Sequence, residues 1–360
     1  MTALALATAT LLIVGCPSPG GGGTTTTTAY FAYVANDSSN NVSAYSIGSS
    51  GKLAQLSGSP FAAGSAPSAV AVSPNGSFLY VANGGSNNVS AFTIGSGGAL
   101  APISGTFTTG SGPYGIAISP NGNYLYVTNG GSNTVSAFTI GSGGALAPIS
   151  GTFTTGSGPY GIAISPNGNY LYVTNGISTG SNGISAFTIG SGGALAPISG
   201  TFTTDSGPNG IAISPNGNYL YVANSDSYTV SAFIIGSGGA LAPISGTFTT
   251  DSGPGGIAIS PNGNYLYVAN TDSYTVSAFT IGSGGALAPI SGTFTTGTKP
   301  WGIAISPNGN YLYVANANSN TVSAYSIGSN GALTQLTSVG SPFASGSGPY
   351  GVAVATVTSQ

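Results

Sequence analysis

The stretch 113-PYGIAISPNGNYLYVTNG-130 decides the fold, because variants of it recur along the whole chain. The proline of its SPNG segment lies at Pro74, Pro120, Pro166, Pro215, Pro261 and Pro307, with steps of 46, 46, 49, 46 and 46 residues. A period of roughly 40 to 50 residues is typical of one blade of a β-propeller. The longer step is a loop insertion, in which Asn175–Phe187 replaces the shorter Asn129–Phe138.

Within one repeat the residue pattern predicts four strands. GIAIS (115–119) and NYLYVTN (123–129) flank SPNG, whose proline and glycine suit a tight turn. The third strand is TVSAFTI (134–140), and a fourth runs from Leu146 to Phe153. The first two strands are apolar on both faces, so this sheet needs packing neighbours on both sides. The length of the unit favours a propeller blade over a β-solenoid coil or the strands of an outer-membrane barrel.

The two ends of the chain predict that the ring closes. The YVTN-like motif and the motif that begins at the first-strand proline each occur seven times. The chain nevertheless opens with a second-strand copy, AYFAYVAN (29–36), and ends with a first-strand copy, PYGVAVATV (349–357). Joined, they complete a blade and leave no free sheet edge. We therefore predict an all-β, seven-bladed β-propeller of four-stranded antiparallel blades over residues 30–360, closed by pairing of the N-terminal and C-terminal strands.

The composition excludes several function classes. Apolar residues make up 41% of the chain and charged residues 2%, and His, Arg and Glu are absent. Two lysines cannot neutralise a nucleic-acid backbone, so nucleic-acid binding is excluded. Without His there is no side chain that ordinarily titrates near neutral pH. Zinc sites and Ser-His-Asp or Cys-His catalysis lack their ligands or base, and we expect no cofactor.

The N-terminal segment MTALALATATLLIVGC (1–16) predicts export. Its apolar run is too short to span a bilayer but is typical of a signal-peptide core. Residues 13–16 (IVGC) resemble the lipobox of bacterial lipoproteins, although no Lys or Arg precedes the apolar run. The resemblance implies a signal peptide over residues 1–15, a lipidated Cys16 and a flexible Gly/Thr tether over 16–29, with the protein anchored in the cell envelope. The alternative is an ordinary signal peptide with an incidental cysteine.

The repeat also resembles a known family. PxGIAISPNGNYLYVAN, followed by NTVSAFTI, is similar to the YVTN-repeat and lactonase-like family of seven-bladed β-propellers over residues 30–356. The matching residues belong to strands and turns, so the resemblance implies fold more than function. The lactonase branch, which includes 6-phosphogluconolactonase-type enzymes, implies His, Arg and Glu in the central cavity. This chain has none of them, so no position inherits those roles.

The copies differ most clearly at the residue after the first-strand proline. This residue is Ser68, Tyr114, Tyr160, Asn209, Gly255, Trp301 and Tyr350 in successive copies. If the first strand lines the axis, these residues surround one mouth of the channel, and aromatic rings there suit stacking on a sugar or anchoring a peptide. The predicted ligand-binding residues are Tyr114, Tyr160, Asn209, Lys299, Trp301 and Tyr350. The alternative is that the rings only plug the tunnel.

Four of the five aspartates form two matched pairs. Asp205 and Asp251 occupy the same position in successive repeats, and Asp226 and Asp272 share another. Facing carboxylates suit calcium binding or glycosidase chemistry. The alternative is that these aspartates are solvated turn residues. The sequence favours this alternative because Asp is frequent in turns. We therefore predict no catalytic residue and no metal, with Asp205 and Asp251 as the calcium alternative.

These observations favour a non-catalytic binding or structural module of the cell envelope, presented as a monomer on a lipid anchor. Its partner would be an envelope glycan, a peptide or a protein. One alternative is a lactonase-like hydrolase of the 6-phosphogluconolactonase type, acting on a sugar lactone. Another is a surface-layer or adhesive protein. The residue inventory separates these hypotheses, because an enzyme needs a base and only five Asp and two Lys are available.

Overall fold

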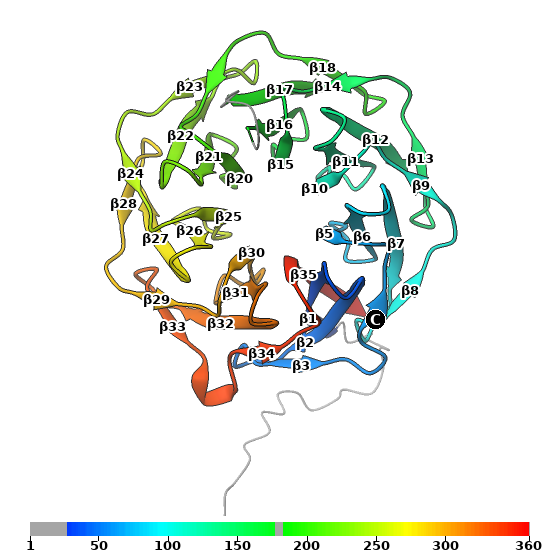
Figure 1. Ribbon diagram of the computed structural model, residues 1–360, viewed down its shortest axis with the longest axis vertical. Coiled ribbons are helices and arrows are strands. Elements are labelled where there is room, and N and C mark those ends of the chain that lie inside the picture. The colour runs from blue at the N-terminus through cyan, green and yellow to red at the C-terminus, as the bar shows by residue number, and fades with distance from the viewer. Residues whose placement is uncertain (1–26, 177–182, 360) are drawn as a thin grey trace, which may run out of the picture.

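The computed structural model describes residues 27–176 and 183–359. Figure 1 shows seven small antiparallel sheets arranged around a central axis, which confirms the predicted seven-bladed propeller. We number the blades I to VII in the chain order of their innermost strands. The predicted signal peptide, Cys16 and most of the tether lie outside the described residues, as does loop 177–182.

Blades I to IV follow one another along the chain. Blade I comprises β5 (Pro67–Val72), β6 (Phe78–Asn83), β7 (Asn88–Ile94), β8 (Leu100–Pro102) and β9 (Phe107–Thr108). Blade II comprises β10 (Pro113–Ile118), β11 (Tyr124–Asn129), β12 (Thr134–Ile140), β13 (Leu146–Pro148) and β14 (Phe153–Thr154). Blade III comprises β15 (Pro159–Ile164), β16 (Tyr170–Asn175), β17 (Gly183–Ile189), β18 (Leu195–Pro197) and β19 (Phe202–Thr203). Blade IV comprises β20 (Pro208–Ile213), β21 (Tyr219–Asn224), β22 (Thr229–Ile235), β23 (Leu241–Pro243) and β24 (Phe248–Thr249).

Blades V and VI continue the series, and blade VII combines both ends of the chain. Blade V comprises β25 (Pro254–Ile259), β26 (Tyr265–Asn270), β27 (Thr275–Ile281), β28 (Leu287–Pro289) and β29 (Phe294–Thr295). Blade VI comprises β30 (Pro300–Ile305), β31 (Tyr311–Asn316), β32 (Thr321–Ile327), β33 (Leu333–Gln335), the short 3-10 helix η1 (Thr337–Val339) and β34 (Phe343–Ala344). Blade VII comprises β35 (Pro349–Ser359), β1 (Thr27–Asn36), β2 (Asn41–Ile47), β3 (Leu53–Gln55) and β4 (Phe61–Ala62).

The outer edge of each blade differs from the prediction. The single fourth strand expected from Leu146 to Phe153 is two short strands, β13 and β14, which both pair with β12. The break follows Pro148, which has no N–H for a ladder, and contains Gly151, whose φ is 133°. The blades therefore have five strands, four in one path and a fifth that shares the third strand.

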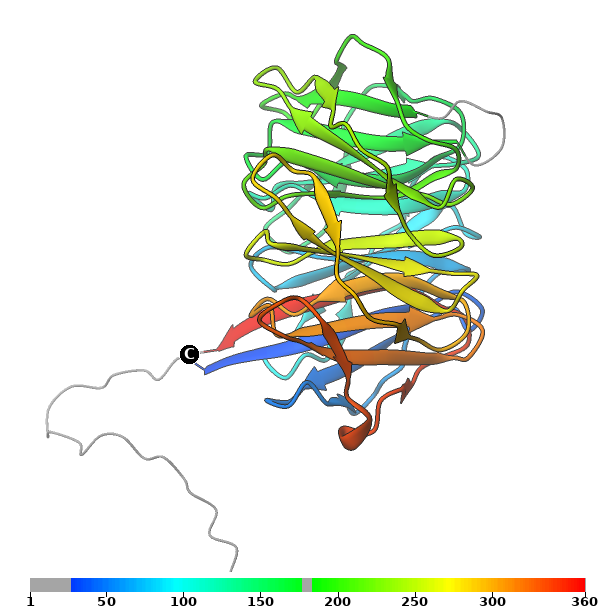
Figure 2. The same cartoon turned by 90° about the vertical axis from the view of Figure 1, so that its left-hand side faces the viewer.

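Blade VII closes the ring as predicted. β1 pairs antiparallel with β35, with Phe31 opposite Ala355 and Tyr33 opposite Ala353. Figure 2 shows the free ends of the two strands leaving the ring together on one face. Within the described ranges, no helix has the length and apolar character needed to cross a membrane.

The hydrophobic core lies between blades. At the junction of blades IV and V, Tyr221, Val230 and Phe248 of blade IV pack in one cluster with Leu266 and Val268 of blade V. An equivalent cluster fills each of the seven junctions. This arrangement explains why the inner strands are apolar on both faces, since each face covers a different neighbour.

A tyrosine hydrogen bond crosses every junction. The Tyr221 hydroxyl donates to the carbonyl of Gly285 at 2.8 Å, in the turn between β27 and β28 of the next blade. The equivalent donors are Tyr33, Tyr80, Tyr126, Tyr172, Tyr267 and Tyr313. Gly285 has a φ of 79°, and a Cβ there would lie 2.5 Å from Cδ1 of Tyr219, so only glycine fits this turn.

We expect Tyr221→Phe to lower the free energy of unfolding by about 1 kcal/mol, because it removes one net hydrogen bond and leaves the packing unchanged. Urea unfolding followed by circular dichroism measures this difference. The matched control is Tyr228→Phe, since Tyr228 is 46% exposed. Equal losses for the two variants, or no loss for Tyr221→Phe, would contradict the assignment.

Candidate functional site

The first strand of every blade lines the axis and begins with a β-bulge. Between β10 and β11 the register shifts between Pro113 and Ile116, so Tyr114 and Gly115 stand outside the regular ladder. The same shift occurs where β15, β20, β25 and β30 begin. A bulge redirects side chains, and here it brings the variable residue after the proline to the mouth of the channel.

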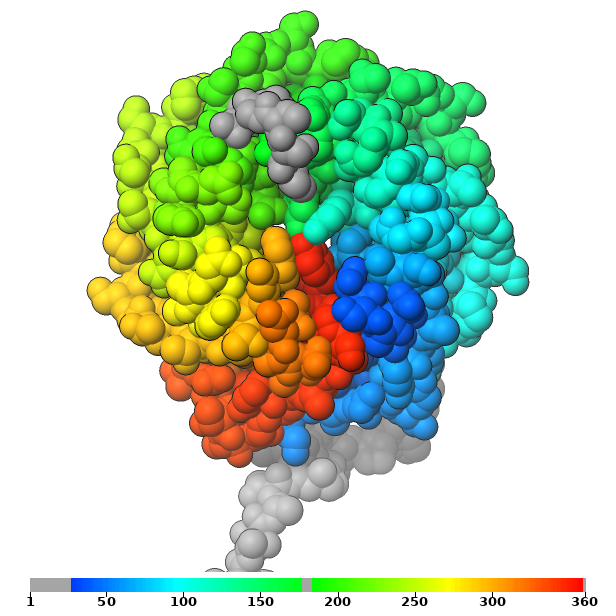
Figure 3. Space-filling model, in the orientation of Figure 1, coloured from blue at the N-terminus to red at the C-terminus, as the bar shows by residue number. Residues whose placement is uncertain are grey.

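A cavity of about 150 Å³ opens on the axis at this level. Aromatic rings and glycine backbone dominate its wall. The lining residues are Ser68, Ala69, Tyr114, Gly115, Tyr160, Gly161, Gly210, Gly255, Gly256, Trp301, Gly302, Tyr350 and Gly351. In the space-filling view, side chains narrow the central opening to a small gap (Figure 3).

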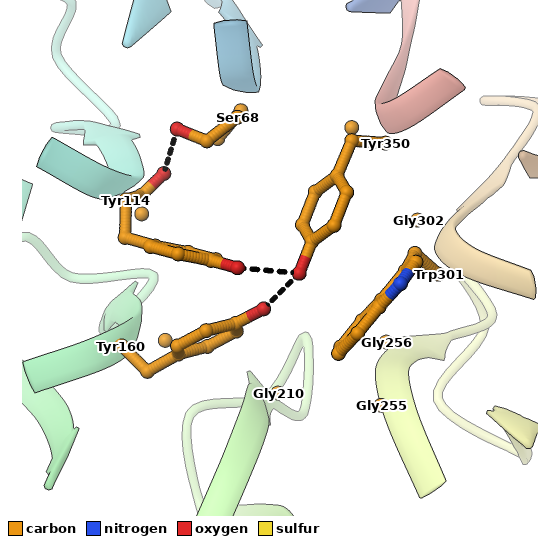
Figure 4. A pocket seen from close by; sticks show the side chains of 13 residues that line it. Ser68, Tyr114, Tyr160, Gly210, Gly255, Gly256, Trp301, Gly302 and Tyr350 are labelled. Atoms are coloured by element: carbon orange, nitrogen blue, oxygen red, sulfur yellow. Dashed lines mark hydrogen bonds between the residues drawn. The ribbon is translucent and has the colours of Figure 1, made fainter. Parts of the chain in front are cut away.

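Three tyrosine hydroxyls converge beside this cavity (Figure 4). The hydroxyls of Tyr114 and Tyr350 are 2.6 Å apart, and that of Tyr160 also bonds to Tyr350. Trp301 stacks on Tyr350 with ring centroids 4.8 Å apart. The three hydroxyls carry three protons and the two hydrogen bonds use two of them, so one O–H is left to donate to a ligand.

Two of these phenols, Tyr160 and Tyr350, are neutral donors. Burial raises the pKa of Tyr160 far above its ordinary value, and the neighbouring Tyr350 and Tyr114 raise it further. Burial likewise raises the pKa of Tyr350, with further contributions from Tyr114 and from the charge of Asp37. Neither phenol therefore serves as a base or an anionic nucleophile near neutral pH.

Asp37 lies next to this cluster. It lines a second cavity of about 260 Å³ that shares Ser68, Tyr114 and Tyr350 with the axial cavity. Its backbone N–H donates to the carbonyl of Gly348 at 2.8 Å. Burial raises the pKa of its carboxyl group. Within residues 27–176 and 183–359, no donor bonds to its carboxylate oxygens, which leaves them available to a ligand or water.

The sequence analysis missed Asp37 as a site residue. It follows a second-strand motif near the N-terminus, whereas Tyr350 belongs to a first-strand motif near the C-terminus. Ring closure brings them together, because Asn36 is the register partner of Pro349. The available signal was its position directly after the YVAN motif, where the next three copies have Gly84, Gly130 and Gly176.

Two predicted ligand residues are not among those that line the axial cavity. Asn209 is 8% exposed, and its Oδ1 has no hydrogen-bond partner among the described residues. Lys299 adopts a left-handed φ of 58°, and its carbonyl accepts a hydrogen bond from the N–H of Ala317. Of the six predicted residues, the structure brings Tyr114, Tyr160, Trp301 and Tyr350 together.

The calcium alternatives bond to nearby threonines. Thr229 donates to Oδ2 of Asp205 at 2.6 Å, and Thr275 donates to Oδ2 of Asp251 at 2.5 Å. In the part of the chain that the structure describes, no group of three or more His, Cys, Asp or Glu side chains could hold a metal ion. These aspartates therefore have the geometry of turn residues.

The chain matches the family model described as "Lactonase, 7-bladed beta-propeller" over residues 24–158, 143–248 and 236–345. It is 26% identical to a candidate 6-phosphogluconolactonase from Bacteroides uniformis, with a TM-score of 0.79 over 91% of this chain and 99% of that chain. A second candidate 6-phosphogluconolactonase, from Bacteroides fragilis, gives 26% identity and a TM-score of 0.79 over 91% and 98%. A periplasmic gluconolactonase of Pseudomonas aeruginosa, 21% identical, has a TM-score of 0.76 over 91% and 99% and shows the fold alone. No curated protein sequence is significantly similar to this chain.

These similarities correct the main functional prediction. The hypothesis of a non-catalytic binding or structural module is wrong, because the family match and the two neighbours at 26% identity favour the lactonase-like alternative. The prediction gave most weight to the missing His, Arg and Glu, and among the remaining aspartates it weighed only the two matched pairs and not Asp37. A partly buried carboxylate beside neutral hydroxyl donors is also a site for such chemistry.

The raised pKa of Asp37 predicts a pH-dependent stability effect. Between its unfolded and folded pKa values the folded protein binds more protons, so stability falls as pH rises through that window. We expect Asp37→Asn to raise Tm at pH 7 and to give no such gain at pH 3, where the unfolded carboxyl is also protonated. Thermal unfolding at both pH values measures the effect, with exposed Asp226→Asn as control. A loss of stability at pH 7, or the same gain at both pH values, would contradict it.

Proposed function

Because the chain belongs to the lactonase family of seven-bladed β-propellers, we propose that it hydrolyses a lactone at the axial mouth, between Asp37 and the three tyrosines. The observation that carries this proposal is the position of Asp37. It is the acidic residue that lines the second cavity, which shares Tyr114 and Tyr350 with the axial cavity, and its carboxylate oxygens have no hydrogen-bond partner among the described residues. The lactonase names of the two neighbours support the same reaction class.

The proposed reaction uses Asp37 as general base. Its carboxylate accepts a proton from water as the water oxygen bonds to the lactone carbonyl carbon. The spare phenol O–H of the tyrosine cluster donates to the oxyanion that forms on the carbonyl oxygen. When the tetrahedral intermediate collapses, the ring C–O bond breaks and the protonated Asp37 returns its proton to the leaving oxygen. The product is a hydroxy acid, and Asp37 is again ionised.

The charges at the site favour an uncharged lactone. No cationic side chain lines either cavity, and Lys299, the basic residue predicted for the site, is absent from the lining of both. A phosphate group would stand near the Asp37 carboxylate without a compensating charge, which is unfavourable. We therefore propose a neutral substrate whose ring packs against Trp301, in contrast to the phosphorylated lactone named for the two neighbours.

The proposal also includes an orientation at the cell envelope. The cluster lies at the ring face of Asn36 and Pro349, whereas Thr27 pairs with Ser359 at the far end of the same two strands. If Cys16 carries a lipid as its sequence predicts, the chain would reach that lipid from Thr27, at the ring face opposite the site. The cavity would then open away from the membrane.

We expect the purified protein to hydrolyse D-glucono-1,5-lactone above the spontaneous rate and to prefer it over the 6-phosphate. Asp37→Asn should lower kcat by about 10²- to 10⁴-fold, since general-base catalysis contributes that much. The rate should rise with pH through the raised pKa of Asp37 and then stay level, because no His titrates. Acid release followed at constant pH measures this, with Asp226→Asn as control. Lactone hydrolysis unaffected by Asp37→Asn, or no hydrolysis by the wild type, would overturn the proposal.

A further inference from the structure

Aromatic rings from four different blades line the axial cavity. They belong to Tyr114 of blade II, Tyr160 of blade III, Trp301 of blade VI and Tyr350 of blade VII (Figure 4). Each ring lies next to two others, and the centroid distances around this cycle are 3.8, 6.3, 4.8 and 5.7 Å. These four side chains therefore form one continuous surface, which we call the aromatic wall.

The widest spacing in the aromatic wall is the 6.3 Å between the centroids of Tyr160 and Trp301. Blades IV and V stand between these two residues in the ring and add no aromatic side chain at the same level. Blade IV has the buried Asn209, which does not line the cavity, and blade V has Gly255, which has no side chain. Glycines of these two blades line the cavity instead.

The hydroxyl groups around the cavity already have partners. Oγ of Ser68 lies within hydrogen-bond distance of three backbone carbonyls, at 3.0 to 3.2 Å. The three tyrosine hydroxyls bond to one another. Apart from these residues and Trp301, the lining is alanine and glycine. A ligand group with several N–H donors would therefore exchange water for few acceptors, whereas a group without N–H needs none.

The charges around the cavity favour a cation. Among the described residues no Lys lines either cavity, whereas Asp37 lines the second cavity, which shares Ser68, Tyr114 and Tyr350 with the axial one. The charge of Asp37 acts on the aromatic wall, since it contributes to the raised pKa of Tyr350. The faces of aromatic rings also attract a cation that lies within about 6 Å of the ring centroid. Both effects have the same sign.

We propose that the axial cavity binds a quaternary ammonium group, held by the aromatic wall and by the charge of Asp37. Such a group carries a positive charge but no N–H, so it matches a lining that is rich in aromatic surface and poor in unengaged hydroxyls. The cavity of about 150 Å³ has room for it, because an engineered cavity of that size holds benzene, and tetramethylammonium has fewer heavy atoms than benzene.

This inference goes beyond the proposed function and does not depend on turnover. The ammonium group would occupy the cavity in which the proposed lactone ring packs against Trp301, so it should also inhibit hydrolysis competitively. Tetramethylammonium chloride is a suitable probe, since it has no bond that the proposed hydrolysis breaks. Trp301 is the sole tryptophan of the chain, so its intrinsic fluorescence reports directly on the cavity.

The first experiment compares three ligands on the wild type by isothermal titration calorimetry at constant ionic strength. tert-Butanol has as many heavy atoms as tetramethylammonium but no charge, and methylammonium has the charge but also three N–H donors. Both should bind at least about tenfold more weakly than tetramethylammonium. Equal affinity for tert-butanol or for methylammonium would overturn the proposal, as would the absence of tetramethylammonium binding in calorimetry and in Trp301 fluorescence.

The second experiment replaces Trp301 with residues that other blades carry at the same position, which the backbone there accepts. Trp301→Tyr copies Tyr114 and keeps a ring, so the affinity should stay within about threefold of the wild type, whereas Trp301→Ser copies Ser68 and should lower it at least about tenfold. Asp37→Asn should also weaken binding, and the exposed Asp226→Asn, which changes the charge equally, should not.

Full affinity in Trp301→Ser, the same loss in Trp301→Tyr as in Trp301→Ser, or the same loss in Asp226→Asn as in Asp37→Asn would overturn the ammonium site. If Trp301→Ser does not fold, the two aspartate variants and the ligand comparison still decide. Tetramethylammonium binding without lactone hydrolysis by the wild type would support this site and refute the hydrolase. Hydrolysis without tetramethylammonium binding would refute the ammonium site alone.

Discussion

The buried tyrosine that bonds across each blade junction is the constraint on which the ring depends. A single blade has apolar inner strands on both faces and cannot cover them alone. Each junction is filled by one such tyrosine and its apolar neighbours, and the buried hydroxyl must have an acceptor. The glycine turn of the next blade supplies that acceptor at all seven junctions. These include the two junctions of blade VII, which combines both ends of the chain. The repeat period, the junction tyrosine and the glycine of the acceptor turn therefore serve one requirement, which is to fill each blade junction and to pair its buried hydroxyl.

This requirement explains which features the sequence could predict. Strands, tight turns and closure repeat with the junctions, so counting motifs was sufficient to predict seven blades. The split outer strand escaped prediction because Leu146 and Phe153 are both apolar and the segment between them is short. Only the missing N–H of Pro148 and the positive φ of Gly151 separate the two pairings. Such a local break leaves little trace in a hydrophobic pattern.

The candidate site was predictable only in part, for a different reason. The residues after the first-strand proline share one place in the repeat, and this placed Tyr114, Tyr160, Trp301 and Tyr350 together. Lys299 was included because it is near Trp301 in the sequence, but its left-handed backbone belongs to a turn. Asp37 stands alone in its position and meets Tyr350 only after the chain ends pair. Distance along the chain concealed this neighbour from a sequence analysis.

The blades are nearly identical in sequence, so the few positions at which they differ distinguish the two sides of the axial cavity. Junctions I–II to III–IV, which carry Tyr114 and Tyr160, have Ser or Thr hydroxyls that complete their interior hydrogen bonds. The opposite side carries Trp301 and Tyr350, and its bulge peptides have no side-chain hydroxyl partner of this kind among the described residues. The tyrosine hydroxyls of the two sides nevertheless form one cluster, since Tyr114 and Tyr160 both bond to Tyr350. In the proposed hydrolysis the lactone ring would pack against Trp301, with its carbonyl oxygen near this cluster and its carbonyl carbon open to a water activated by Asp37.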